Sequence, residues 1–156
     1  MTLKQLEQAV LEQRMKERPN IPKHAVPPVK FTDKTANGLQ KAIVAHLNLM
    51  GHKAWRQNSG GRYIQPEYKH NIMGKRVEIK KGKYIPQGKA GGKGAGDVVA
   101  TLKPWGKSCH IEVKIGKDRQ HESQIEFQQE HEAAGGIYMI VKNWEQYIDQ
   151  IKPWIK

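Results

Sequence analysis

The sequence predicts an α/β domain in which helices flank a central mixed β-sheet. After residue 30, three segments have the pattern of helices, and four have the β-branched and apolar runs typical of strands. The predicted helices are residues 35–50, 120–134 and 143–151, and the predicted strands are residues 52–57, 98–102, 108–115 and 137–141. A hairpin or flap separates the first strand from the next two. Helices and strands that follow one another in this order suit a sheet covered by helices.

Length and charge limit the classes of function. The 156 residues suit one domain with a tail. Lys and Arg number 27 against 15 Asp and Glu, a net charge of +12, so the natural partner is a polyanion. Binding to a ribosome-like assembly or to a membrane surface would also fit this charge. A single cysteine, Cys109, excludes an internal disulfide, and no apolar run is long enough for a membrane span. We therefore expect a soluble cytoplasmic protein.

The N-terminal region has the pattern of a helix followed by a linker. Residues 2–18 place apolar side chains at roughly helical spacing among charges, and residues 19–28 contain four prolines that favour extended backbone. We expect residues 1–30 to form this helix and linker, and residues 31–156 to form the main domain. The helix could pack on the domain or on a second subunit, so a homodimer is one expectation.

The first predicted helix of the main domain, residues 35–50, carries an apolar stripe that suits a core. Asn37 lies in its first turn. The strand at residues 52–57 ends in a turn that Arg56 and Arg62 flank. Guanidinium groups at these positions suit phosphates, although a solvated basic loop end explains each arginine equally well.

A strongly basic segment follows and predicts a contact with nucleic acid. Val77 and Ile79 alternate with charges before Lys81-Gly82, which indicates a small hairpin with a cationic face. Such a hairpin would bind the nucleic-acid backbone without reading bases. A solvated charged face is the alternative. The predicted phosphate contacts, with the two arginines included, are Arg56, Arg62, Lys75, Arg76, Lys80, Lys81, Lys83, Lys89 and Lys93.

The chemically most informative stretch is the hairpin formed by residues 98–102 and 108–115. If Lys103 to Gly106 form a four-residue loop, Asp97 lies opposite Glu112, and opposing side chains are roughly 5 Å apart at Cβ. Alternation along the second strand places Glu112 and Lys114 on one face and the apolar residues on the other. Two carboxylates this close can share a cation, and Mg2+ suits oxygen ligands. A solvated strand face is the alternative interpretation.

Glycines between residues 88 and 96 precede this hairpin but fit neither phosphate-loop template, so nucleotide binding is not expected there. Flexible backbone that lets a phosphate approach is the better interpretation. After the hairpin, Gln120, Gln124 and Gln128 recur every fourth residue and would share one face of the helix at residues 120–134. Solvated glutamines are the alternative.

Taken together and in this order, five motifs resemble the PD-(D/E)xK nuclease superfamily, and within it the virus-type replication-repair nuclease (VRR-NUC) domains of phages and mobile elements. The resemblance covers roughly residues 35–141. The motifs are Thr35-Ala-Asn-Gly-Leu-Gln40, Arg56-Gln-Asn-Ser-Gly60, Gly94-Ala-Gly-Asp97, Ile111-Glu-Val-Lys114 and Asp118-Arg-Gln-His-Glu-Ser-Gln124. It implies a restriction-endonuclease-like core of the order αβββαβ, here with a basic β-hairpin insertion, in a bacterial or phage-infected cell.

The resemblance also implies a set of site residues. The positions that match Asp97 and Glu112 hold Mg2+ or Mn2+, and we add the backbone carbonyl of Val113 as a ligand. The position that matches Lys114 orients or activates the attacking water, and the one that matches Gln124 leans on the active site. Related domains often carry Glu where this chain has Asn37, which can ligate through its carbonyl oxygen but brings no charge.

The expected function is hydrolysis of DNA phosphodiester bonds by a metal-dependent endonuclease. Branched, flapped or nicked DNA is the expected substrate. The main alternative is a non-catalytic basic module that binds nucleic acid and retains a degenerate nuclease site, which Asn37 favours. A basic RNA-associated structural protein would explain the charge but not the pattern of Asp97, Glu112 and Lys114.

Overall fold

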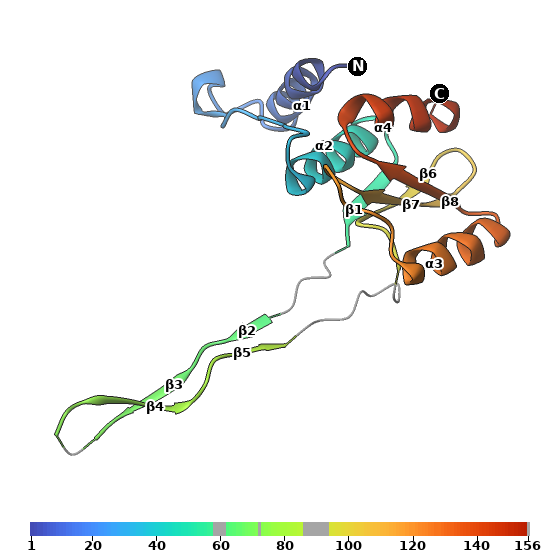
Figure 1. The fold of residues 1–156 in the computed structure, drawn as a ribbon. Coiled ribbons are helices and arrows are strands. Elements are labelled where there is room, and N and C mark those ends of the chain that lie inside the picture. Colours follow the sequence, from blue (N-terminus) through green and yellow to red (C-terminus); the bar gives the residue numbers. More distant parts are fainter. Residues whose placement is uncertain (58–61, 72, 86–93, 156) are drawn as a thin grey trace. The chain divides into compact units, whose positions relative to one another are not determined.

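The computed structural model of the chain describes residues 1–57, 62–71, 73–85 and 94–155. The chain forms two compact units, coloured by sequence in Figure 1. The first unit contains Met1–Gln57 and Lys93–Lys156, and the second contains Asn58–Gly92. No helix in the described ranges is both long enough and apolar enough to cross a membrane.

A mixed four-stranded sheet is the centre of the first unit, which confirms the predicted α/β class. The strands are β1 (Lys53–Arg56), β6 (Val98–Leu102), β7 (Lys107–Val113) and β8 (Ile137–Val141). They lie in the order β1-β6-β7-β8, in which β6 is antiparallel to both β1 and β7 while β8 runs parallel to β7. The parallel pair needs a crossover, and α3 supplies it.

Within the described residues four α-helices accompany the sheet, and each of them lies within two residues of its predicted range. They are α1 (Leu3–Glu17), α2 (Ala36–Leu49), α3 (Glu122–Ala133) and α4 (Trp144–Ile151), with short 3₁₀ turns at Lys23–Ala25 and Lys152–Trp154. The hydroxyl of Thr35 caps α2 by accepting from the N–H of Gly38 at 3.1 Å. The amide oxygen of Asn143 caps α4 in the same way. α3 starts two residues later than predicted.

The two faces of the sheet have different coverings. Side chains of one face form the hydrophobic core together with α2, α4 and Leu6 of α1. They are Ala54, Val98, Ala100, Leu102, Cys109, Ile111, Val113, Ile137, Met139 and Val141. On the other face, His110 and Tyr138 pack against Phe127 of α3, with ring centroids 4.9 and 6.1 Å apart. Glu112 follows His110 on this second face by strand alternation.

Helix α1 is part of the core rather than a separate tail. Leu6 is fully buried, and the carboxylate of Glu7 accepts a hydrogen bond from the backbone N–H of Phe31 at 2.7 Å. The indole N–H of Trp144 donates to the carbonyl of Met1 at 2.9 Å. Helix α1 and the sheet thus belong to the same unit, in agreement with the expectation that the helix could pack on the domain.

The second unit contains an antiparallel ribbon. Its strands are β2 (Arg62–Ile64) paired with β5 (Lys83–Ile85), and β3 (Glu67–His70) paired with β4 (Arg76–Lys80). The amide oxygen of Asn71 accepts from the N–H groups of Met73 and Lys75, and Gly74 adopts a φ of +72°, so the turn lies there. Lys81-Gly82 is not the turn of a hairpin but separates β4 from β5.

Replacing Leu6 by alanine tests how α1 contributes to stability. Leu6→Ala removes a fully buried side chain, so we expect the free energy of unfolding to fall by about 3 kcal/mol. Lys16→Ala, at an exposed position of the same helix, should change it by less than about 0.5 kcal/mol. Urea denaturation of both variants measures the difference. Equal effects would show that α1 does not dock on the core.

A buried histidine makes the fold sensitive to acid. His46 of α2 is buried, its Nδ1 lies 2.8 Å from the hydroxyl of Tyr147, and its ring stands edge-on to Trp144. Burial lowers the pKa of His46 from its usual 6.5 to about 4. The unfolded chain therefore binds more protons than the folded chain between these two pH values, and stability falls as pH decreases through this window.

We expect the free energy of unfolding to decrease below pH 6.5 by up to about 1.4 kcal/mol per pH unit from His46. His46→Asn removes the titrating group while keeping a hydrogen-bonding atom, so the pH dependence should become shallower between pH 6.5 and 4. His24→Asn, at an exposed position, is the matched control. Unfolding measured across this pH range would contradict the interpretation if His46→Asn and His24→Asn had the same slope.

Candidate active site

Asp97 and Glu112 occupy opposing positions of the hairpin, as predicted. β6 and β7 pair from Leu102 with Lys107 to Val98 with Ile111, and the loop between them is the predicted four residues. The next step of this register brings Asp97 opposite Glu112. The N–H of Val113 donates to Oδ2 of Asp97 at 3.1 Å, so the Asp97 carboxylate turns toward β7. Its backbone carbonyl accepts from Gln57 at 2.8 Å, which continues the pairing of β1 with β6.

Glu112 and Lys114 form a buried ion pair. Nζ of Lys114 lies 3.2 Å from Oε1 of Glu112, and the two residues are 4% and 3% exposed. The carboxylate of Asp118, which is half-exposed, lies 3.4 Å from the same ammonium. The N–H of Lys114 donates to the carbonyl of Val141, so pairing with β8 extends to this residue. Burying such a pair usually costs as much as its Coulomb energy returns, so its position here points to chemistry rather than stability.

Gln124 is held in a single orientation against this pair. Its amide oxygen accepts from the N–H of His121 at 2.9 Å, within a capping box at the start of α3. Its amide nitrogen consequently points to Glu112 and donates to Oε1 at 2.5 Å. The predicted proximity of Gln124 to the carboxylates is therefore present. Gln120 and Gln128 bond to each other instead, at 2.9 Å, so the three glutamines do not act together.

Asn37 and Arg56 form a second pair at the same end of the sheet. The guanidinium of Arg56 donates to the amide oxygen of Asn37 at 2.7 Å, and both residues are exposed. Arg56 pairs with Val98, the residue that follows Asp97, so this end of β1 lies beside the start of β6. The sequence predicts that the amide oxygen of Asn37 approaches a cation beside the carboxylates. In the structure this oxygen instead accepts a hydrogen bond from Arg56 and so positions the arginine.

The oxygen atoms at this site suit a hard divalent cation. Asp97, Glu112 and the Val113 carbonyl provide two anionic side chains and one neutral oxygen on adjacent strands. Mg2+ commonly binds through one or two carboxylates and completes its shell with water and phosphate oxygens. Within residues 1–57, 62–71, 73–85 and 94–155, no group of three or more His, Cys, Asp or Glu side chains is arranged to hold a metal. A cation here would therefore depend on water and substrate oxygens.

Tyr138 belongs to the site but was not predicted. It lies opposite His110 in the parallel pairing of β7 with β8, and its hydroxyl donates to the carbonyl of Gly94 at 3.2 Å. Burial raises the pKa of Tyr138 well above its usual range, and the negative charges of Glu112 and Asp97 raise it further. The phenol therefore stays protonated beside the carboxylates. Alternation along residues 137–141 was the signal that could have identified it.

Two glycines before Asp97 are required for close packing rather than for flexibility. Gly94 has a φ of +84°, and a Cβ there would collide with the backbone carbonyl of Ser123 in α3. A Cβ at Gly96 would lie 2.9 to 3.0 Å from backbone atoms of Ile111. At these two positions the loop therefore contacts α3 and β7, and approach of a phosphate stays a prediction. The predicted glycines at 88, 91 and 92 lie outside the described residues.

His110, on the same face as Glu112, packs against α3 and bonds to the loop before Asp97. Its ring centroid lies 4.9 Å from Phe127 and 4.6 Å from His131, and Nδ1 accepts from the N–H of Gly96 at 3.3 Å. These contacts fix the loop before Asp97 and the helix α3 to the same strand.

Most of the predicted phosphate contacts lie on the ribbon of the second unit. Lys75, Arg76, Lys80, Lys81 and Lys83 are all exposed there. The guanidinium of Arg76 stacks over the ring of Tyr68 at 3.7 Å, and Lys80 pairs with Glu67 at 2.9 Å. Arg62 lies in β2, and Lys89 and Lys93 lie outside the described residues.

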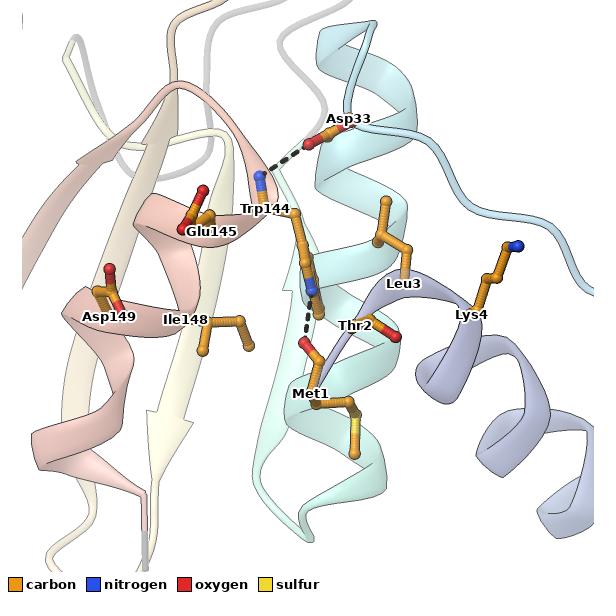
Figure 2. A pocket seen from close by; sticks show the side chains of 9 residues that line it. All are labelled: Met1, Thr2, Leu3, Lys4, Asp33, Trp144, Glu145, Ile148 and Asp149. Carbon is orange, nitrogen blue, oxygen red and sulfur yellow. Dashed lines mark hydrogen bonds between the residues drawn. The ribbon is translucent and has the colours of Figure 1, made fainter.

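A cavity of about 540 Å³ lies elsewhere, between the start of α1 and α4. Figure 2 shows Trp144 at its centre, with hydrogen bonds to Asp33 and to the carbonyl of Met1. Ile148 and Leu3 are among the apolar residues that line it. None of the site carboxylates lines it, so the cavity is separate from the candidate active site.

Comparisons do not identify a relative: no family model, no curated protein and no solved structure matches the chain.

The buried ion pair leads to a prediction about stability. Lys114→Met leaves the Glu112 carboxylate buried without its ammonium, so we expect a loss of about 3–5 kcal/mol in the free energy of unfolding. The double variant Glu112→Gln/Lys114→Met removes both charges and should lie within about 1 kcal/mol of the original protein, or above it. Urea denaturation measures each variant.

Lys41→Met, at an exposed position of α2, is the matched control for loss of an ammonium group. A Lys114→Met variant as stable as Lys41→Met would contradict the description of a buried pair.

Proposed function

We propose that this chain is a metal-dependent nuclease that hydrolyses DNA phosphodiester bonds at a site formed by Asp97, Glu112 and Lys114. The observation that carries the proposal is that the register of β6 and β7 brings two carboxylates to opposing positions, with a buried ammonium 3.2 Å from the carboxylate of Glu112. Stability alone does not explain these three charges at the end of a sheet. The strand order and the mixed sheet also support a restriction-endonuclease-like core of the virus-type replication-repair nuclease kind.

In this proposal each charged residue has a distinct part in hydrolysis. Asp97, Glu112 and the Val113 carbonyl would hold Mg2+ or Mn2+, and such a cation would supply positive charge that polarises the phosphate. The ammonium of Lys114 donates to the attacking water and stabilises negative charge on the phosphate oxygens. The water oxygen gives up a proton and bonds to phosphorus, the bond from phosphorus to the bridging oxygen breaks, and that oxygen takes up a proton, so the products are a phosphomonoester end and a hydroxyl end.

Neighbouring residues hold this arrangement in place. Gln124 and Lys114 both bond to Oε1 of Glu112, which leaves the carboxylate little freedom to rotate. Asp118 provides a second partner for the ammonium. Arg56, oriented by Asn37, presents a guanidinium at the same end of the sheet, where it suits a phosphate of the substrate. Preorganised donors of this kind act without rearrangement during the reaction.

The ribbon supplies affinity for the nucleic-acid backbone in this proposal. Its described basic side chains are exposed, and an exposed lysine or arginine that approaches a phosphate releases counterions. Contacts of this kind follow backbone shape rather than base sequence. This favours an endonuclease directed by DNA structure, such as a branch, flap or nick, and the resemblance alone adds a phage or mobile element as its source.

A non-catalytic nucleic-acid-binding module is the second candidate. The neutral Asn37, which bonds to Arg56 in place of a carboxylate at this position, favours it. Such a module would use the same basic residues but would need no divalent cation. Its affinity for DNA should be the same in EDTA as in Mg2+.

Cleavage of labelled DNA tests the proposed nuclease. We expect Mg2+ or Mn2+ to support cutting of at least one of four substrates (single-stranded, duplex, flap and four-way junction) and EDTA to abolish it. Lys114→Ala should reduce the rate roughly 10²-fold or more, because it removes a preorganised donor. Lys152→Ala, at an exposed position after α4, should cut at the original rate.

Binding without cutting in either metal, unchanged by EDTA and by Lys114→Ala, would overturn the nuclease and favour the binding module.

A further inference from the structure

An exposed tryptophan lies on the same face of the sheet as the carboxylates. Trp55 is in the middle of β1, and alternation places it opposite to Ala54, which points into the core. Its side chain therefore lies on the face that carries Asp97 and Glu112. It remains 47% exposed, although an indole is one of the largest apolar groups a sheet can bury.

The register determines how close Trp55 is to the site. Trp55 pairs with Val99, two residues after Asp97, so Trp55 and Asp97 are diagonal neighbours across β1 and β6. Diagonal neighbours on one face are about 7–8 Å apart, within reach of an aromatic side chain. Helix α3 packs on β8, at the opposite edge of the sheet order from β1 (Figure 1). The indole thus lies at the edge of the face that α3 leaves open.

The surroundings of Trp55 suit an anionic, aromatic ligand. Lys53 shares its strand face and is exposed, whereas alternation turns Arg56 to the other face. An aromatic ring beside a cationic side chain is an arrangement on which bases of a single strand stack while a phosphate is neutralised. A stacked base needs an exposed ring face, which a base paired inside a duplex does not offer.

We propose that Trp55 stacks on an unpaired nucleobase next to the scissile phosphate, which a cation bound at Asp97 and Glu112 would hold, so the substrate carries at least one unpaired nucleotide at the cleavage point. This inference rests on the proposed nuclease and defines its substrate class. The indole provides the stacking surface, Lys53 contacts the phosphate on the far side of that base, and the sheet fixes the spacing between stacking and reaction.

Binding in EDTA tests the inference independently of cleavage. The probes are a short single-stranded oligodeoxythymidine and a blunt duplex of the same length, with affinity measured by fluorescence anisotropy. Trp55→Ala should weaken binding of the single strand about 5- to 150-fold, the range expected for loss of one base–aromatic stack, and leave duplex binding unchanged. Trp55→Phe should retain part of the affinity because it keeps a smaller stacking surface.

Trp105→Ala is the matched control. Trp105 is 49% exposed, close to the value for Trp55, but lies in the turn between β6 and β7, at the other end of the hairpin from Asp97. Its removal should leave both affinities unchanged. Far-ultraviolet circular dichroism and urea denaturation show whether each variant is folded, which is expected because both side chains are exposed.

Four outcomes would overturn the inference. In the first, Trp55→Ala binds the single strand as tightly as the original protein; in the second, Trp55→Ala loses the same affinity for the single strand and for the duplex. In the third, Trp105→Ala loses as much single-strand affinity as Trp55→Ala. In the fourth, light scattering shows a dimer of the original protein that Trp55→Ala dissociates. The last would assign the face to a second copy of the chain. If no metal supports cleavage but single-strand binding depends on Trp55, the nuclease fails and the stacking site remains.

Discussion

The ion pair between Glu112 and Lys114 is the interaction on which the arrangement of the candidate site depends. Both charges are almost fully buried, and three elements contribute to the pair: β7 carries Glu112 and ends just before Lys114, α3 provides Gln124, and β8 pairs with the backbone of Lys114. Each partner satisfies an atom that would otherwise be costly to bury. A shift of α3 would break the bond from Gln124, so the position of the helix and the electrostatics of the pair are coupled.

Close packing supports the same arrangement from the other side. Gly94 and Gly96 bring the loop before Asp97 into backbone contact with α3 and β7, and Tyr138 bonds to the carbonyl of Gly94. The loop, helix and sheet therefore restrict one another. Rigid surroundings of this kind are what a reaction needs in order to hold charged groups in a fixed geometry, because no energy is then spent on reorganisation. The apolar core on the opposite face, completed by α1, provides the stability that the charged face does not.

Those parts of the fold that depend on local pattern could be predicted from the sequence. The class, the sheet strands, the four-residue turn and the opposition of Asp97 to Glu112 follow from periodicity and loop length, because strand side chains alternate strictly. Contacts between distant segments could not be predicted in this way. The docking of Leu6, the bond between Asn37 and Arg56, the part of Tyr138 and the turn at Asn71 depend on which surfaces meet, and one-dimensional pattern does not contain that information.

The hydrogen bond between the N–H of Gln57 and the carbonyl of Asp97, 2.8 Å long, has a consequence for how such a chain can diversify. The backbone leaves the sheet after Gln57 and re-enters it at Asp97, and these two points are hydrogen-bonded neighbours. The entropy of closing a connection grows only slowly with its length, by about 0.6 kcal/mol for each doubling. The segment between them can therefore be lengthened, shortened or exchanged at little thermodynamic expense to the sheet. Evolution can alter the ribbon as an independent module while the residues that surround Glu112 stay constant.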